Sequence, residues 1–244
     1  MSSKDNLYIN GCSFTAGDKI DDKDTWPYKL SKLTDTNLFV EAKNGQSFSS
    51  IYQNTILHLS KFDNKNTTVV IGLTWPNRYL ITYRGFNINV TPADQQRAQI
   101  MSKLDPWRRL SSSNYFTSDT IEFDEQCDSI TSERENIEPI YMSAIEYIKN
   151  QMTYNPDYVD DVFNIYQTQV ISLQNFLINQ NFNYCFVAFG TEATHLRKLR
   201  DNKAGKKFLD FSKFLIFDIT KNNTSHPTPD DCTLISKMVY ELIL

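Results

Sequence analysis

The sequence predicts an α/β fold with a parallel sheet of about five strands and helices on both faces. Short apolar segments alternate with longer amphipathic ones, the pattern of successive βα units. The segment at 68–72 is apolar throughout, as expected for a parallel strand buried on both faces. The chain has 244 residues, of which 40% are hydrophobic. This is enough for one full-sized core, so we predict a single domain over residues 1–244.

The first part of the chain contains three predicted strands with helices between them. The strands are expected at 7–11, 38–42 and 68–72. A helix beginning near Thr25 carries Trp26, Leu30 and Leu33 at helical spacing. The turn and cap sequence Asn44-Gly45-Gln46-Ser47 introduces the next helix, which carries Ile51, Ile56, Leu57 and Leu59.

A long insertion, residues 74–160, interrupts this pattern. We expect a hairpin at 79–90, helices at 92–104 and 139–152, and an irregular polar segment at 110–138. The insertion is too long for an ordinary connection, and long insertions are often binding lids. We therefore interpret it as a binding lid, with a dimer surface as the alternative.

The α/β pattern returns in the last third of the chain. Strands are predicted at 184–189 and 214–217, after helices at 159–179 and 192–201. The final helix, residues 229–244, has a clear start, with Thr228 as N-cap, Pro229 in its first position, and Asp230 and Asp231 in its first turn.

Polar residues follow the predicted strands at one edge of the sheet. Ligands bind in open α/β sheets at the carboxyl ends of the strands. Ser13 lies in a glycine-flanked loop after the first strand, and His226 lies in the loop before the last helix. The other two histidines, His58 and His195, lie on helices and are interpreted as surface or packing residues. Ser13 and His226 are therefore the candidate nucleophile and base.

Composition excludes several classes of protein. The net charge is −4, which argues against a nonspecific nucleic-acid binder. The four cysteines form no C-x-x-C pair, which argues against a zinc site or a redox motif. We expect no metal and no cofactor. No apolar run approaches the roughly 20 residues of a membrane span. The polar N-terminus does not resemble a secretory signal, so we expect a cytoplasmic protein; its oligomeric state is left open.

Four blocks along the chain resemble the SGNH (GDSL-type) hydrolases. Gly11-Cys12-Ser13-Phe14-Thr15-Ala16-Gly17 is similar to G-D-S-x-T-x-G, with Cys12 at the usual aspartate. Asn44-Gly45 and Ile71-Gly72-Leu73-Thr74 are similar to the second block and to the third, G-x-N. His226-Pro227 is similar to the end of D-x-x-H-P. The G-C-S-F-T form also resembles a group of such proteins in tailed-phage genomes.

This resemblance implies a three-layer, flavodoxin-like fold and a serine esterase or deacylase acting on an acylated glycan or small ester. It makes Ser13 the nucleophile and His226 the general base. The N–H groups of Ser13 and Gly45, with a side chain from Thr74 or Asn77, would form the oxyanion hole.

Two positions depart from the family pattern. Asn223 stands where an aspartate usually orients the histidine, and it can orient a ring but carries no charge. Asp218 is the nearest acid that could substitute. Thr74 replaces the asparagine of the third block. Cys12 adjoins the nucleophile, but side chains diverge in a turn, so we expect Cys12 to point into the fold.

Other functions fit the same residues. The altered Thr74 and Asn223 suit a catalytically silent binding or accessory protein, and an acyltransferase would use the same serine while excluding water. The Ser13-x-Thr15-x-Gly17 loop would also suit phosphate binding, but the acidic residues that follow would repel an anion. In the insertion, Trp75 and Arg78 lie closest to the sheet edge and are the expected substrate contacts.

Overall fold

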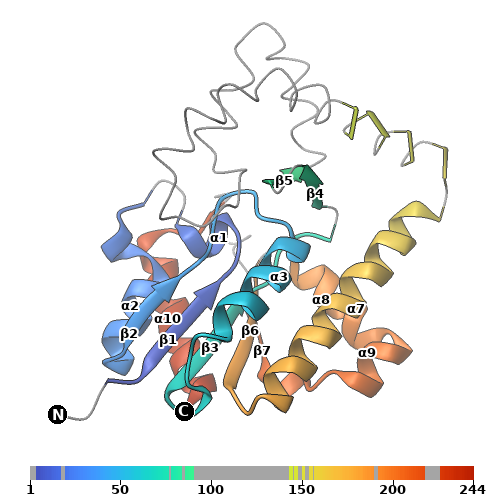
Figure 1. The fold of residues 1–244 in the computed structure, drawn as a ribbon. Coiled ribbons are helices and arrows are strands. Elements are labelled where there is room, and N and C mark those ends of the chain that lie inside the picture. Colours follow the sequence, from blue (N-terminus) through green and yellow to red (C-terminus); the bar gives the residue numbers. More distant parts are fainter. Residues whose placement is uncertain are drawn as a thin grey trace, which may run out of the picture.

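The protein is built on one five-stranded parallel sheet, seen in a computed structural model (Figure 1). The structure describes residues 4–17, 20–76, 78–83, 86–90, 157–189, 192–217 and 226–244, with scattered residues between 143 and 155. The strands are ordered β2-β1-β3-β6-β7, the flavodoxin-like arrangement. Their bounds are β1 Asn6–Asn10, β2 Asn37–Val40, β3 Thr67–Gly72, β6 Asn183–Phe189 and β7 Phe214–Phe217.

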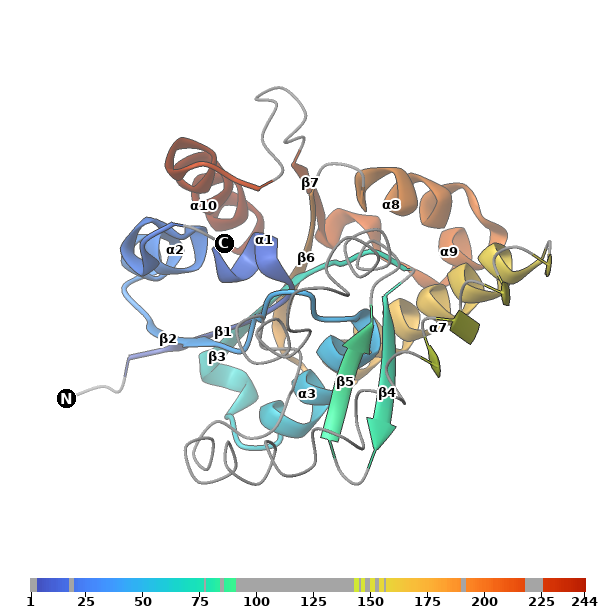
Figure 2. The same cartoon turned by 90° about the horizontal axis from the view of Figure 1, so that it is seen from above.

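Helices cover both faces of this sheet, which makes three layers (Figure 2). One face carries α2 (Trp26–Thr34) and α10 (Pro229–Ile243). The other carries α3 (Phe48–Leu59), α7 (Tyr158–Asn179), α8 (Glu192–Asp201) and α9 (Lys203–Phe208). Short helical turns are α1 (Ser13–Ala16), η1 (Asp22–Asp24), η2 (Asn64–Asn66) and η3 (Phe211–Lys213).

The predicted fold class is therefore confirmed, and burial explains the strand pattern. The central strands β3 and β6 are buried along almost their whole length, whereas β2 at the edge is largely exposed. Two hydrophobic cores fill the spaces between the sheet and its helices. Leu33 and Leu57, which follow the helical spacing in the sequence, are nevertheless 45% and 56% exposed, and Ile165 on α7 is 60% exposed, so all three lie outside the core.

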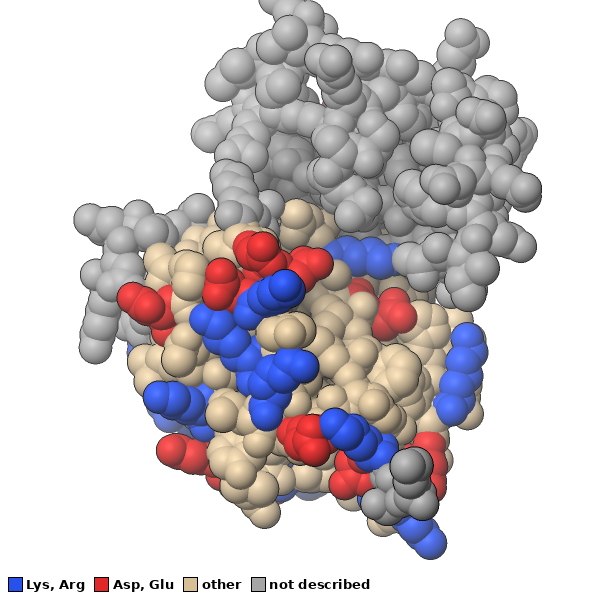
Figure 3. Space-filling view, turned by 90° about the vertical axis from the view of Figure 1, so that its left-hand side faces the viewer, with Lys and Arg blue, Asp and Glu red and all other residues tan. Residues whose placement is uncertain are grey.

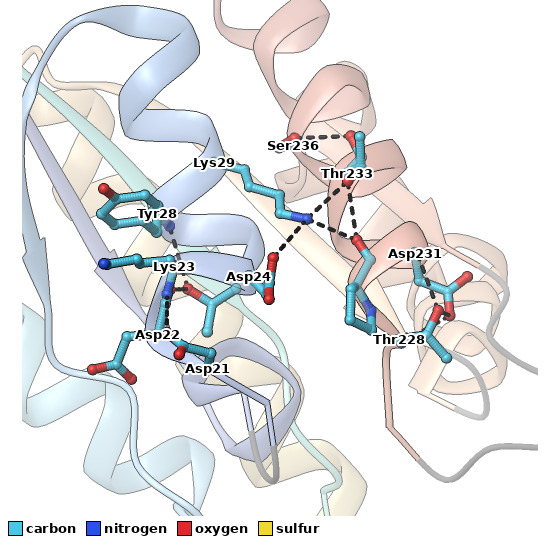
Figure 4. A network of polar contacts seen from close by, with 12 residues as sticks. Asp21, Asp22, Lys23, Asp24, Tyr28, Lys29, Thr228, Asp231, Thr233 and Ser236 are labelled. Atoms are coloured by element: carbon cyan, nitrogen blue, oxygen red, sulfur yellow. Dashed lines mark hydrogen bonds and ion pairs between the residues drawn. The ribbon is translucent and has the colours of Figure 1, made fainter.

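Polar contacts join α2 and α10, which lie side by side on the same face of the sheet (Figure 4). Lys29 on α2 donates hydrogen bonds to the Pro229 carbonyl at 3.0 Å and to Thr233 Oγ1 at 2.9 Å, both on α10. Lys29 also pairs with Asp24 at 3.5 Å. Within α10, the Asp231 carboxylate accepts from the Thr228 N–H, and Thr228 Oγ1 accepts from the Asp231 N–H, which forms a capping box. These contacts fix the start of α10.

The insertion begins with an antiparallel hairpin, β4 (Tyr79–Tyr83) and β5 (Phe86–Val90), as predicted. The expected helix at 92–104 and the polar segment at 110–138 lie outside the described residues, and so does most of the expected helix at 139–152.

Charged side chains are mixed on the face of the molecule on the α2 side. Lysine and arginine side chains there are interspersed with acidic and uncharged ones (Figure 3). Among the described residues, no helix is both long and apolar enough to cross a membrane.

Candidate active site

The loops that follow the neighbouring strands β2, β1 and β3 lie close together at the carboxyl edge of the sheet. The β1–β2 ladder continues past both strands, because the Lys43 N–H donates to the Gly11 carbonyl at 3.2 Å. On the other side of β1, Asn10 is in register with Ile71. Ser13, Gly45 and Thr74 each follow within a few residues of these pairs. The strand order β2-β1-β3 therefore brings the three predicted loops together.

Ser13 begins the short helical turn α1 and contacts His226 directly. Its Oγ lies 3.0 Å from His226 Nε2, and the two residues are 213 positions apart in the sequence. Ser13 is 7% exposed. Cys12, just before it, is fully buried, as predicted. The hydroxyl and the imidazole are within the reach that proton transfer requires.

Aromatic packing supports the His226 ring. The Phe14 ring lies 4.9 Å from the imidazole, between ring centroids, and stacks on Phe189 at 5.7 Å. The Trp26 indole N–H donates to the Phe14 carbonyl at 3.2 Å. The residue that follows the serine therefore packs against the histidine, and the histidine lies two residues before the N-cap of α10.

The serine turn is seated in a slot between β1 and β3. Gly11 and Gly72 face each other there, and the Thr15 side chain of α1 fills the space that Cβ atoms would take at both positions. The Thr15 hydroxyl is buried and has no hydrogen-bond partner in the described part of the chain. The glycines at the strand ends are thus required by close approach, and Thr15 fixes the depth of the turn that carries Ser13.

Asn10 anchors the end of β1 to α3 just before the serine. Its side-chain N–H donates to Thr55 Oγ1 at 3.0 Å and to the Ile51 carbonyl at 3.2 Å, while its side-chain oxygen accepts from the Gly11 N–H. Tyr8 lies in the same buried cluster, and burial raises the pKa of its phenol. The phenol therefore stays neutral.

The Gly45 loop turns sharply just after the level of the β2 strand end. Gly45 adopts a φ of 75°, in the left-handed region that favours glycine. Neither the Ser13 N–H nor the Gly45 N–H donates a hydrogen bond within the residues the structure describes. Gln46, fully buried, braces the loop by accepting from the Lys43 N–H at 3.2 Å.

Thr74 and Arg78 form the third wall of the site. An Arg78 Nη1 N–H donates to Thr74 Oγ1 at 2.8 Å and to the Gln46 carbonyl at 3.4 Å. Thr74 is fully buried. Trp75 is partly buried, and its indole N–H has no partner among the described residues. Arg78 also lines a groove between α3, α7 and β4, together with Phe48, Ser49, Pro76, Leu80, Val162, Ile165, Tyr166 and Gln169.

Three predicted positions lie outside the described residues: Asn77, Asn223 and Asp218. The side chain of His195 is also not described, whereas His58 is partly buried and its Nδ1 lies 3.2 Å from Glu41. Among the described residues, no cluster of three or more metal-ligating side chains occurs. The Cys185 and Cys232 thiols are buried, and burial raises the pKa of Cys185 to about 12 and of Cys232 to about 11. Neither thiol is a nucleophile at neutral pH.

Sequence reasoning missed the roles of Phe14, Thr15 and Gln46. The pair of glycines at the ends of adjacent strands, Gly11 and Gly72, is the signal that could have identified the Thr15 slot. No pattern identified Gln46, because a buried glutamine in a turn looks like any polar loop residue.

Comparison with solved structures shows which fold this is. A protein of the G-D-S-L lipolytic family from Desulfitobacterium hafniense DCB-2 matches with a TM-score of 0.51 and 9% identity, covering 98% of this chain and 99% of that one. A carbohydrate esterase family 2 enzyme with a carbohydrate binding domain, from Corynascus thermopiles (Myceliophthora fergusii), matches with a TM-score of 0.50 and 10% identity, covering 100% of this chain and 66% of that one. No family model and no curated protein matches the sequence. The chain has an SGNH hydrolase-like fold.

Proposed function

We propose that the protein is a serine esterase or deacylase that acts on an acylated glycan or small ester. Ser13 is the nucleophile and His226 is the general base. The single observation that carries this proposal is the 3.0 Å contact between Ser13 Oγ and His226 Nε2. A fold brings residues 213 positions apart into this geometry only by specific packing, and this pair lies at the edge where α/β folds bind ligands.

The reaction follows from the chemistry of this pair. His226 Nε2 takes the hydroxyl proton as Ser13 Oγ attacks the ester carbonyl carbon, and the carbonyl oxygen becomes an oxyanion. The imidazolium then gives its proton to the departing alcohol, which leaves Ser13 acylated. A water molecule, activated by the same imidazole, attacks the acyl-enzyme and releases the acid. No cofactor or metal enters this sequence of steps.

The N–H groups of Ser13 and Gly45 are the proposed oxyanion donors, because neither donates a hydrogen bond within the described residues. Thr74 is the third proposed donor, with Asn77 as the alternative. Asn223, or Asp218, is proposed to orient the His226 ring. The groove beside Arg78 and the partly buried Trp75 are proposed to receive the substrate.

A fluorophosphonate probe tests the proposal directly. We expect the probe to label Ser13 of the folded wild-type protein, and we expect Ser13→Ala and His226→Gln to lose the label. Ser236→Ala is the matched control, since the Ser236 hydroxyl donates to the Thr233 carbonyl within α10 and belongs neither to the pair nor to the groove beside Arg78. Peptide mass spectrometry identifies the labelled residue. A folded wild-type protein that remains unlabelled would rule out both the esterase and an acyltransferase, and would favour a catalytically silent binding protein.

An acyltransferase using the same serine is separated from the esterase by the fate of the acyl group. We expect release of p-nitrophenol from p-nitrophenyl acetate to continue through many turnovers in water alone. A single burst that resumes only when an alcohol such as a sugar is added would identify a transferase instead.

A further inference from the structure

We propose that Arg78 is a positioning residue that makes Thr74 an oxyanion donor, in the place where the resembling family has an asparagine amide. This inference rests on the proposed esterase function. The Thr74 hydroxyl would stabilise the oxyanion in place of the asparagine amide of the family. The observations behind this are the hydrogen bonds that Arg78 donates at the site.

The direction of one hydrogen bond restricts the orientation of the Thr74 hydroxyl. A guanidinium has only donors, so Thr74 Oγ1 accepts the 2.8 Å bond from Arg78 Nη1. The hydroxyl proton must then point away from Arg78. No other hydrogen bond of the Thr74 hydroxyl occurs among the described residues. The bond from Arg78 thus occupies one lone pair of the hydroxyl and leaves its proton for another acceptor.

Charge strengthens the same hydroxyl as a donor. An arginine keeps its positive charge at any pH a protein experiences, and a donor that itself accepts from a cation is polarised. Thr74 is fully buried, so this polarisation acts in a medium of low dielectric constant. The pair supplies what a fixed amide dipole supplies in the third block of the family.

Arg78 also reaches the second loop of the oxyanion hole. The same nitrogen donates to the Gln46 carbonyl at 3.4 Å, and Gln46 follows Gly45 directly. Gln46 is fully buried and is held by the Lys43 N–H and by Ser50. One guanidinium thus ties the Gly45 loop to the Thr74 loop, so the two donors keep a fixed separation.

The test is a set of variants assayed with p-nitrophenyl acetate, a substrate with no charged group for Arg78 to bind. We expect Thr74→Val to lower kcat by about 10²–10³-fold and Arg78→Ala by about 10–10²-fold, with little change in KM. The double variant should be at most a few-fold slower than Thr74→Val, because the arginine acts mainly through the hydroxyl and only its longer 3.4 Å bond to the Gln46 carbonyl remains to be lost. Thr74→Asn should recover activity in the Arg78→Ala background.

A second readout guards against a merely structural effect. Guanidinium ion at millimolar concentration should raise kcat of Arg78→Ala but not of Thr74→Val, while circular dichroism confirms that each variant is folded. Multiplicative losses in the double variant, or a loss that falls on KM alone, would overturn the role of Arg78 and leave the esterase intact. A wild-type protein with no Ser13 labelling would overturn both proposals.

Discussion

The close packing of the Thr15 side chain between Gly11 and Gly72 predicts that a larger residue at Gly72 destabilises the fold. A Cβ added at Gly72 would lie 3.4 Å from Thr15 Cβ and 3.5 Å from Gly11 Cα, and far inside van der Waals contact with Thr15 Oγ1. The strand is central and cannot move away easily. Overpacking of this kind costs about 1–3 kcal/mol, so Gly72→Ala should be less stable by that amount. For a chain of this length, the loss corresponds to a fall in Tm of about 2–12 °C.

A double-mutant cycle isolates the contact between a new Cβ at position 72 and the Thr15 side chain. Thr15→Ala removes the atom that the new Cβ would strike, and the hydroxyl that it removes is buried without a described partner. Its own cost is therefore small, since the lost methyl group and the lost unpaired hydroxyl offset each other. We expect Gly72→Ala/Thr15→Ala to be about as stable as Thr15→Ala alone, measured by urea unfolding. The coupling energy should equal most of the loss in Gly72→Ala.

A clash elsewhere in the fold provides the control. A Cβ at Gly205 on α9 would strike the Leu199 carbonyl, so Gly205→Ala should also be destabilised. Gly205 is remote from α1, so this variant should keep its full rate of Ser13 labelling at a temperature where both proteins are folded. Gly72→Ala should label more slowly. Additive free energies of unfolding in the cycle, or equal labelling rates in Gly72→Ala and Gly205→Ala, would refute the conclusion that the Thr15 side chain fills the space between Gly11 and Gly72.

Two further predictions concern pH and the last helix. Burial raises the pKa of Cys185 to about 12, so the folded state favours the neutral thiol. The free energy of unfolding should therefore fall as pH rises from about 9 toward 12, by up to about 1.4 kcal/mol per pH unit. Urea midpoints should decline less steeply with pH for Cys185→Ala, and the same decline in both proteins would contradict the shift. Asp231→Ala removes one side of the capping box and should cost about 0.5–2 kcal/mol, whereas Asp230→Ala, which is exposed in the same turn, should cost less; equal losses would argue against the cap.

The fold was predictable because local patterns agree with the tertiary structure. The continuous apolar run of β3 reflects burial on both faces, and Thr228 with Pro229 marks the start of α10 as the structure has it. The helix faces were less predictable, because Leu57 and Ile165 satisfy the helical period and still lie outside the core. Periodicity locates an apolar stripe but does not define how far a neighbouring element covers it.

At the site, sequence identified the residues with distinctive chemistry and missed those that act by shape. Ser13 and His226 were paired because serine and histidine have few alternatives at a strand edge, and their contact is present. Thr15 and Gln46 work through a close approach and a backbone contact, which depend on the positions of separate strands. The roles of Asn77 and Asn223 stay predictions, since both lie outside the described residues.

The bridge from Lys29 to the start of α10 has a consequence for how the protein acquires reactivity. It joins a helix near the beginning of the chain to one at its end, beside His226, the proposed base. During synthesis the N-terminal elements emerge first, so the proposed nucleophile, Ser13, is made long before His226. A nascent or shortened chain would therefore carry an inert serine, and reactivity toward an acyl probe would report that translation has finished and that the final helix has docked.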